Sequence, residues 1–318
     1  RFIAHIGVCT VYYKVLVTGG NGLLGTKTLE LLLAEGRQPI SASLEPECQN
    51  RFLGEFPYHP LDITNATMVR DLVARVRPDA VVHTAAFTAV DACETERELS
   101  WRVNVEGTAH VADACREFGA RMVHISTEYV FDGENGPYRE DDAPRPISHY
   151  GLTKLHSERV VRERCPDWVI ARTTILLGHA PNVRPSFLAW LVDRLGRGER
   201  ARIVDDQVGS PTLADNLAQM LLALLDSRRR EVFNAVGDTI VDRYSFSVMA
   251  ARLFDLDPDL IDRIKTSDLK QAAPRPLKAG LLMDKFKSSF PQVPVLRAEE
   301  ILDRLRSQMR GSAESATL

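Results

Sequence analysis

Short apolar runs alternate with amphipathic segments along the first half of the chain. The runs are rich in β-branched residues, as buried parallel strands are, and the segments after them repeat apolar residues at helical spacing. The expected strands are residues 14–18, 40–44, 79–84, 121–126 and 168–172. The expected helices are residues 26–35, 64–76, 96–118 and a segment that includes 150–154. This alternation predicts an α/β fold with a doubly wound parallel sheet.

Beyond Thr173 the alternation loosens. Helices are expected at about 187–195, 213–225, 244–254 and 298–309, a strand at 232–235, and a Pro-rich stretch at 273–277. We predict one domain of residues 12–173, completed by about 206–235, and a smaller interleaved domain of residues 174–205 and 236–310. Residues 311–318 read as a disordered tail, and the first ten residues read as an extension rather than a signal peptide.

Composition excludes several function classes. A net charge of −3 gives no basic surplus for nucleic acid or an anionic membrane, and no apolar run approaches the roughly 18 residues of a membrane span. The five cysteines are scattered and lack C-x-x-C spacing. We therefore expect reduced thiols and a cytoplasmic location, not disulfides or a zinc site.

A glycine-rich turn, residues 19–25 with the sequence GGNGLLG, separates the first strand from the first helix. Glycines at 19, 22 and 25 allow a tight turn, close approach of a pyrophosphate, and close helix–strand packing, while the helix N-terminus attracts the anion. Although such a segment is often only a turn, its position predicts a Rossmann NAD(P)-binding domain. The expected ligands in this loop are Gly19, Asn21, Gly22, Leu23, Leu24 and Gly25.

The end of the second strand leaves the choice of dinucleotide open. Ser43 would tolerate the extra phosphate of NADP, whereas Glu45 would bind the ribose diol of NAD if the strand ran further. We favour NADP slightly, with Ser43 as the contact.

Other residues at strand ends are candidates for the same cofactor. Asp62 could accept a hydrogen bond from adenine, or it could cap the helix that begins near Asn65. Residues 83–87 (HTAAF) end a strand with small side chains, which would let a cofactor lie against the backbone or would simply pack tightly. Asn104 is a poor helix former inside an expected helix, and it could hold a water or a carbonyl in a relay to Lys154. The further predicted cofactor ligands are Asp62, Ile63, Ala85, Ala86, Phe87 and Asn104.

Tyr150 and Lys154 are four residues apart, so a helix places them on one face. A close ammonium could lower the phenol pKa by roughly 3 units, equivalent to about 4 kcal/mol. The spacing alone also fits a half-buried tyrosine beside a surface lysine. Ser126 and Thr127 end the preceding strand on the same sheet edge, where a hydroxyl could orient a substrate carbonyl.

Together these motifs resemble the extended short-chain dehydrogenase/reductase superfamily, and most closely the dTDP-4-dehydrorhamnose reductase family. Besides the glycine loop, the resemblance rests on residues 77–94, 126–133 (STEYVFDG), 150–154 (YGLTK) and 206–212 (DQVGSPT). It extends over nearly the whole chain.

The resemblance implies an NAD(P)H-dependent oxidoreductase that reduces a nucleotide-linked 4-keto-6-deoxy sugar. The implied catalytic residues are Tyr150 as proton donor, Lys154 as its activator and ribose ligand, and Thr127 as the carbonyl-orienting hydroxyl. The implied substrate contacts are Thr88, Val90, Tyr129, Ile175, Gln207 and Arg275.

The chain departs from the family pattern at three places. Ile175 replaces an aromatic residue that packs on the sugar, and Glu128 replaces the commoner aspartate. Some members bind magnesium at a dimer interface, but the corresponding positions here are Lys27 and Arg200, so we predict no metal.

Two other functions stay open on the sequence. One is a non-catalytic, cofactor-binding regulatory subunit like the β subunit of methionine adenosyltransferase, and the other is a sugar-nucleotide epimerase or dehydratase. A homodimer is an open expectation for the assembly.

Overall fold

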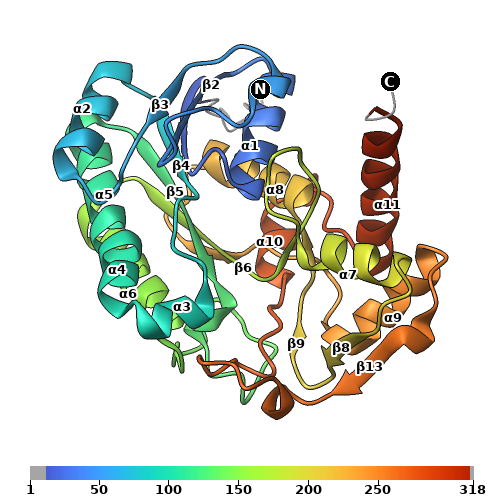
Figure 1. Cartoon of the computed structure of the whole chain (residues 1–318). Coiled ribbons are helices and arrows are strands. Elements are labelled where there is room, and N and C mark those ends of the chain that lie inside the picture. Colours follow the sequence, from blue (N-terminus) through green and yellow to red (C-terminus); the bar gives the residue numbers. More distant parts are fainter. Residues whose placement is uncertain (1–11, 316–318) are drawn as a thin grey trace, which may run out of the picture.

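Seven parallel strands form one large sheet in this protein (Figure 1). The computed structural model describes residues 12–315, with side chains through residue 310. The strand order is β11-β6-β5-β4-β1-β2-β3, and every pairing is parallel. The strands are β1 (Lys14–Thr18), β2 (Gln38–Ser43), β3 (Tyr58–Pro60), β4 (Ala80–His83), β5 (Arg121–Thr127), β6 (Trp168–Thr173) and β11 (Val232–Asn234). The predicted doubly wound Rossmann sheet is confirmed.

Helices cover both faces of the large sheet because alternate strand residues point to opposite sides. Val15 and Val17 of β1 pack in the cluster that contains α1 (Leu23–Ala34) and α8 (Ala214–Asp226). Leu16, between them, packs in the cluster on the other face. That second layer comprises α2 (Ala66–Val76), α5 (Thr108–Phe118) and α6 (His149–Arg164).

The direction of chain progression reverses between β1 and β4, which are neighbours in the sheet. At such a switch point the loops after the two strands separate and leave a crevice at the carboxyl edge. The glycine loop follows β1 and residues 84–88 follow β4, so both predicted cofactor segments border this crevice.

The second half of the chain builds a smaller unit around a third apolar core. Its strands are β7 (Leu176–Leu177), β8 (Ala201–Val204), β9 (Val208–Gly209), β10 (Thr212–Leu213), β12 (Val241–Asp242) and β13 (Ile261–Ile264). Its helices are α7 (Phe187–Gly196), α9 (Arg243–Leu253) and α11 (Ala298–Ser315), while α10 (Asp284–Ser289) packs near β11. Strand β11 comes from this half but completes the large sheet beside β6. The predicted domain boundaries themselves remain a prediction.

Two helix predictions need correction. The single helix expected over residues 96–118 is α4 (Arg97–Trp101), a π-helical turn (Arg102–Gly107) and α5, preceded by α3 (Val90–Thr95). Helix α11 also includes residues 311–315, where the sequence predicted disorder. A helix already anchored by buried Ile301 and Leu305 adds residues at little cost. Residues 316–318 and the N-terminal extension lie outside the described residues.

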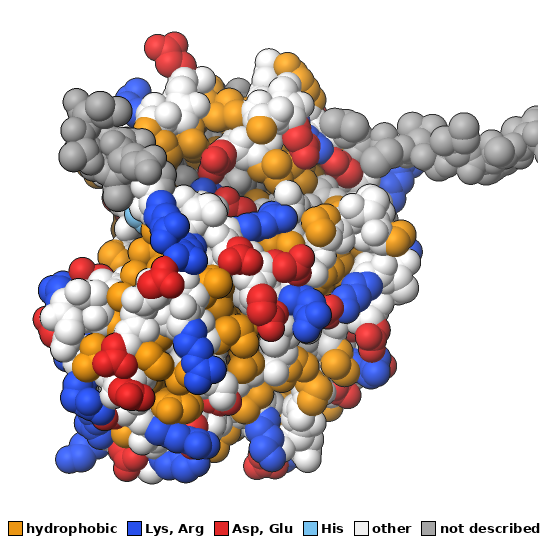
Figure 2. Space-filling model, turned by 90° about the vertical axis from the view of Figure 1, so that its right-hand side faces the viewer, with side chains coloured by type: hydrophobic (Ala, Val, Ile, Leu, Met, Phe, Trp, Pro, Cys, Tyr) orange, Lys and Arg blue, Asp and Glu red, His pale blue; other side chains and the backbone are white. Residues whose placement is uncertain are grey.

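The surface carries charges of both signs. Figure 2 shows acidic and basic side chains interspersed over the face formed by the C-terminal half. Many are paired, as Asp193 of α7 is with Arg197 just after that helix, although exposed pairs of this kind contribute little stability. Among the described residues, no helix has the length and apolar character needed to cross a bilayer.

Candidate active site

The glycine loop after β1 leaves no room for side chains at two of its predicted positions. A Cβ on Gly25 would lie 2.3 Å from the carbonyl oxygen of Gly19. Gly19 itself has a φ of +72°, and a Cβ there would lie 2.7 Å from the amide nitrogen of Ala85. Helix α1 then begins with no side-chain cap and no acidic residue in its first turn. Close backbone approach and uncapped amides fit a diphosphate, so these residues suit a dinucleotide.

The two leucines of the loop contribute differently. Leu24 is buried in the core beside β1, so only its backbone can face a ligand. The Leu23 side chain instead lies against Gly178, where a Cβ on the glycine would be 3.0 Å away.

The end of β2 lies against the glycine loop. The Asn21 amide donates a hydrogen bond to Ser43 Oγ at 2.9 Å, and Asn21 Nδ2 donates to Glu45 Oε2 at 3.1 Å. Strand β2 ends at Ser43, yet the Asn21 contact brings Glu45 to the same edge. Ser43, the predicted contact for NADP, and Glu45, the alternative contact for NAD, therefore both border the glycine loop.

Asp62 does not cap a helix. Its Oδ1 accepts hydrogen bonds from the amide and hydroxyl of Thr64, at 2.9 and 2.8 Å, while Asn65 caps α2 by accepting from the Met68 amide at 3.0 Å. The N-cap interpretation is wrong because the helix starts one turn later than Asp62 could reach. Ile63 is buried against Gly107, so its side chain belongs to the core.

Asn104 fixes the loop after β4. Its Oδ1 accepts from the Phe87 amide at 2.8 Å, and its Nδ2 donates to the Phe87 carbonyl at 3.1 Å and to Thr153 Oγ1 at 3.0 Å. Ala85 and Ala86 lie half-buried in this loop. The predicted carbonyl contact of Asn104 thus exists, but it reaches α6 through Thr153 rather than Lys154.

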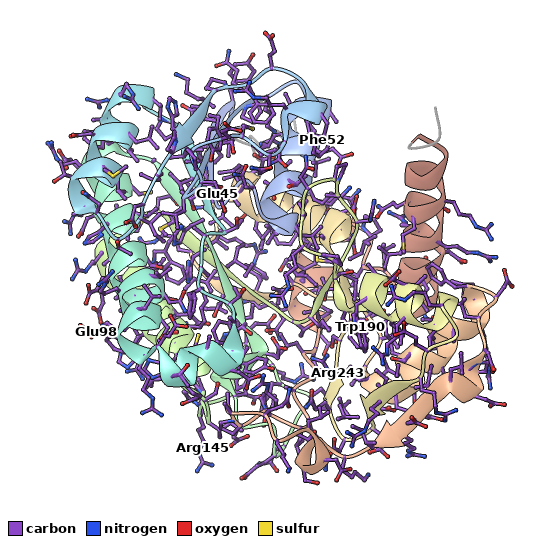
Figure 3. All side chains as sticks on the ribbon, in the orientation of Figure 1. Glu45, Phe52, Glu98, Arg145, Trp190 and Arg243 are labelled. Carbon is purple, nitrogen blue, oxygen red and sulfur yellow. The ribbon has the colours of Figure 1, made fainter. Side chains whose placement is uncertain are left out.

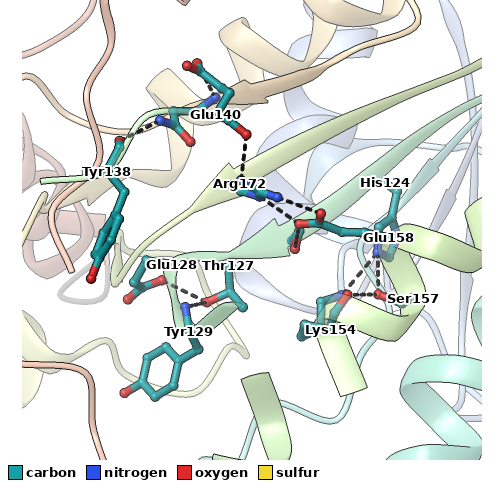
Figure 4. Close-up of polar contacts among 12 residues, drawn as sticks. His124, Thr127, Glu128, Tyr129, Tyr138, Glu140, Lys154, Ser157, Glu158 and Arg172 are labelled. Carbon is teal, nitrogen blue, oxygen red and sulfur yellow. Dashed lines mark hydrogen bonds and ion pairs between the residues drawn. The ribbon is translucent and has the colours of Figure 1, made fainter. Parts of the chain in front are cut away.

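Tyr150 is buried beside Thr127 and Tyr129 at the carboxyl end of β5. The Tyr129 ring packs edge-on against the Tyr150 ring with centroids 5.4 Å apart. Thr127 Oγ1 donates to Glu128 Oε2 at 2.8 Å (Figure 4). Burial raises the pKa of Tyr150, the Glu128 charge raises it further, and a hydrogen bond from Thr127 opposes both. Burial also raises the pKa of Glu128 to about 7.

The Lys154 ammonium lies beside His124. Its Nζ lies 3.5 Å from His124 Nε2, which is also 2.8 Å from Ser157 Oγ (Figure 4). Burial lowers the pKa of Lys154 to about 8, and the Glu158 charge acts in the opposite direction. The pKa of Tyr150 is raised overall, first by burial and then by the Glu128 charge, so the activating role of Lys154 stays a prediction.

A buried ion pair supports the strand ends below this cluster. Glu158 and Arg172 are 1% and 2% exposed, and they form two hydrogen bonds of 2.8 and 2.9 Å. Ser126 Oγ adds a third bond to Glu158 at 2.6 Å. Burial raises the Glu158 pKa, but these bonds and the Arg172 charge outweigh it, so the pKa is lowered overall.

A pocket of about 540 Å³ opens between this cluster and the smaller unit. Three of the predicted substrate contacts line it, namely Tyr129, Ile175 and Gln207. Gln207 is mostly buried, and its Nε2 donates to Thr266 Oγ1 at 3.1 Å.

Arg275 and the residues after β4 are placed differently. The Arg275 guanidinium is held by both carboxylate oxygens of Asp91, at 2.8 and 2.9 Å, and by the Ala273 carbonyl. Thr88 is exposed and Val90 begins α3, and neither lines the pocket. Their roles as substrate ligands stay predictions.

The pocket residues that were missed as contacts on the sequence include Glu128, Phe187 and Arg243. Glu128 could have been found, because it directly follows Thr127 in the recognised motif. Arg243 immediately precedes a predicted helix and carries no motif, so only the fold brings it to the pocket.

Lys27 and Arg200, the positions that argued against a metal, both form ion pairs. Lys27 Nζ lies 3.0 Å from Glu30 and 3.1 Å from Asp215, and Arg200 Nε lies 3.1 Å from Asp262. Within residues 12–315 no group of three or more His, Cys, Asp or Glu residues could hold a metal. The absence of a metal remains a prediction.

Comparisons with known proteins agree with this geometry. A sequence model of the family described as "RmlD substrate binding domain" matches residues 13–307. The dTDP-4-dehydrorhamnose reductase of Streptomyces griseus is 36% identical over 281 residues, 86% of this chain and 87% of the relative. The probable low-salt glycan biosynthesis reductase Agl14 of Haloferax volcanii is 33% identical over 270 residues, 83% of this chain and 88% of the relative.

A solved structure extends the similarity to three dimensions. The dTDP-4-dehydrorhamnose reductase of Bacillus anthracis, crystallised in complex with NADP, superposes with a TM-score of 0.83 at 28% identity. The match covers 93% of this chain and 99% of that chain.

Proposed function

The chain belongs to the RmlD substrate binding domain family, and we propose that it is an NAD(P)H-dependent reductase of a nucleotide-linked 4-keto-6-deoxy sugar. The observation that carries the proposal is the cluster of Thr127, Tyr129 and Tyr150, of which Tyr129 lines the pocket, on the same sheet edge as the glycine loop. Relatives named as reductases favour this function over the regulatory subunit and the epimerase or dehydratase that the sequence left open.

Each catalytic side chain has one proposed task. The nicotinamide of a bound cofactor supplies the hydride that reduces the ketone carbon. Thr127 orients the ketone oxygen, and Tyr150 donates the proton that this oxygen gains. The phenol is protonated at neutral pH, as a proton donor must be, although its raised pKa makes it a weaker acid than a free phenol. Lys154 supplies a buried positive charge for the ribose hydroxyls and for the phenolate left after proton transfer.

The cofactor is NADP or NAD. Ser43 and Asn21 favour NADP slightly because neither brings a charge that would repel a 2′-phosphate, whereas the Glu45 carboxylate at the same edge favours a free ribose diol. The relative rates with NADPH and NADH measure which effect dominates.

The proposal is tested by nicotinamide absorbance. Purified protein is mixed with NADPH or NADH and dTDP-4-dehydrorhamnose, and we expect oxidation that depends on the keto sugar. Oxidation no faster than in a reaction without the sugar, for both cofactors and with a correctly folded protein, would contradict the proposed function.

Glu128 is expected to set the pH dependence of the reduction. Its pKa is about 7, and its ionised form raises the pKa of Tyr150, which makes the phenol a weaker proton donor. The rate should therefore fall as the pH rises through about 7. In Glu128→Gln this fall should disappear from a profile of kcat/KM measured between pH 5.5 and 8.5 in roughly half-unit steps.

The raised pKa of Glu128 also affects the stability of the folded protein. Since the pKa is raised above the value of about 4.3 in an unfolded chain, Glu128 lowers stability as the pH rises from there to about 7. Glu128→Gln should then be at least as stable as the wild type at pH 8. An unchanged pH profile in a stable Glu128→Gln protein would remove Glu128 from this role.

A cytoplasmic location and a homodimer complete the proposal. The four cysteines of the described residues, Cys48, Cys93, Cys115 and Cys165, are free thiols, which supports a reducing compartment. Sedimentation at several protein concentrations decides the assembly state.

A further inference from the structure

Arg243 carries a charge in the substrate pocket that no ion pair among the described residues balances. It is the first residue of α9 and lies on the inner side of the C-terminal half, facing the large sheet (Figure 3). Its guanidinium carbon stands 5.4 Å from the centre of the Phe187 ring. Among the described residues, the guanidinium makes no hydrogen bond and no ion pair. A half-buried cation without an acceptor is unfavourable unless a ligand supplies one.

The other charged groups nearby do not neutralise Arg243. Arg275, the arginine that the sequence predicted for the substrate, forms a bidentate pair with the Asp91 carboxylate. Glu128 lines the same pocket as Arg243 but forms no ion pair with it, and its pKa of about 7 leaves it partly protonated at neutral pH. Arg275 is thus paired and does not line the pocket, whereas Arg243 lines it and has no acceptor among the described residues for its five N–H donors.

The position of Arg243 determines which part of a bound substrate it can contact. Thr127 and Tyr150 mark the place of the reacting carbonyl, which is C4 in a 4-keto sugar. In a pyranose ring C1 lies opposite C4, so a sugar with C4 at this point directs its C1 substituent away from Tyr150. Arg243 and Phe187 line the same pocket as Glu128 and Tyr129, and they come from α9 and α7 of the smaller unit.

We infer that Arg243 binds the diphosphate of the substrate, an inference that rests on the proposed function. The planar guanidinium matches two phosphate oxygens with two parallel hydrogen bonds. The Phe187 ring beside it holds the group by a cation–π contact, so the arginine is partly oriented before the ligand arrives. Arg243 thus makes the pocket specific for a sugar that carries a nucleoside diphosphate over the free sugar.

Binding of nucleotides without any sugar tests the inference. The dissociation constants of dTDP, UDP and thymidine are measured by calorimetry for the full chain, for Arg243→Gln and for Arg243→Lys. We expect Arg243→Gln to weaken the binding of a nucleoside diphosphate by about 10- to 100-fold and to leave thymidine unchanged. Arg243→Lys should recover part of the loss, since lysine keeps the charge but not the paired geometry. Arg202→Gln, at an exposed arginine of β8, is the matched control and should bind as the wild type does.

Three results would overturn the inference. The first is equal affinity for the diphosphate in Arg243→Gln and the wild type, and the second is an equal loss for the diphosphate and for thymidine. The third is a wild type that binds neither dTDP nor UDP. Competition separates the two anions that an arginine could recognise: inorganic pyrophosphate should displace dTDP only when Arg243 is present. Displacement by glucuronate but not by pyrophosphate would assign Arg243 to a sugar carboxylate instead.

The binding test of Arg243 does not depend on whether the protein reduces a keto sugar. If diphosphate binding requires Arg243 but no keto sugar is reduced, the proposed reductase activity fails while this inference stands. If the keto sugar is reduced equally well by Arg243→Gln, with the same KM, the activity stands and the inference fails.

Discussion

Replacing Tyr150 with phenylalanine should lower kcat for reduction of the keto sugar by about 10²- to 10⁴-fold, the usual contribution of a positioned proton donor. The change removes only the hydroxyl that faces Thr127 and keeps the ring that packs against Tyr129. Cofactor binding, measured from nicotinamide fluorescence, should stay within about 3-fold, because the diphosphate contacts of the glycine loop are untouched. Single-turnover absorbance with saturating NADPH reports the chemical step directly.

Tyr129→Phe is the matched control for this prediction. It deletes the same atom from a ring whose centre is 5.4 Å away and which also lines the pocket. We expect a change in KM for the sugar and a loss of kcat below about 10-fold. Equal losses in the two variants, or wild-type kcat in Tyr150→Phe, would show that another group donates the proton.

Replacing Arg172 with methionine should destabilise the fold by about 3–5 kcal/mol, because it leaves the Glu158 carboxylate buried without its main partner. Glu158 is 1% exposed and would keep only Ser126 and the more distant Arg162, at 3.3 Å. For a chain of this size such a loss corresponds to roughly 6–15 °C in the melting temperature. Thermal unfolding by circular dichroism measures it.

The stability lost in Arg172→Met should depend on pH. Arg172 and Ser126 hold the Glu158 pKa below its usual value, so the wild type gains stability above an unfolded pKa of about 4.3 and loses it as the pH falls through the folded value. Without Arg172, burial raises the Glu158 pKa. Above the unfolded pKa, keeping this carboxylate ionised in the folded state then costs free energy. The difference between the two proteins should therefore be largest near neutral pH and should shrink toward pH 4.

Two further variants isolate the buried charge. Arg162→Met removes an arginine that contacts the same carboxylate from a 43% exposed position, and it should cost less than about 1 kcal/mol. Arg172→Met combined with Glu158→Leu should recover much of the stability, since neither buried charge remains. If Arg172→Met is as stable as Arg162→Met, the pair does not hold the strand ends together.

The local pattern of the chain predicted the elements that position the cofactor. Alternating residues such as Val15, Leu16 and Val17 define a strand buried on both faces, and the glycines at 19 and 25 define the turn after it. These features act over a few neighbouring residues, so they can be read without knowing the fold. The π-helical turn at Asn104 could not be predicted in this way, because a contact with Phe87, 17 residues earlier, holds it.

The sequence by itself determined the doubly wound sheet, the glycine loop and the family motifs around Thr127, Tyr150 and Lys154. The tertiary structure decided which charges are available to a substrate. It pairs Arg275 with Asp91 across 184 positions of the chain, turns Lys154 toward His124, and leaves Arg243 open to the pocket. The physical reason is that a strand or a turn depends on nearby residues, whereas the partner and the pKa of a charged group depend on which distant segments the fold packs against it.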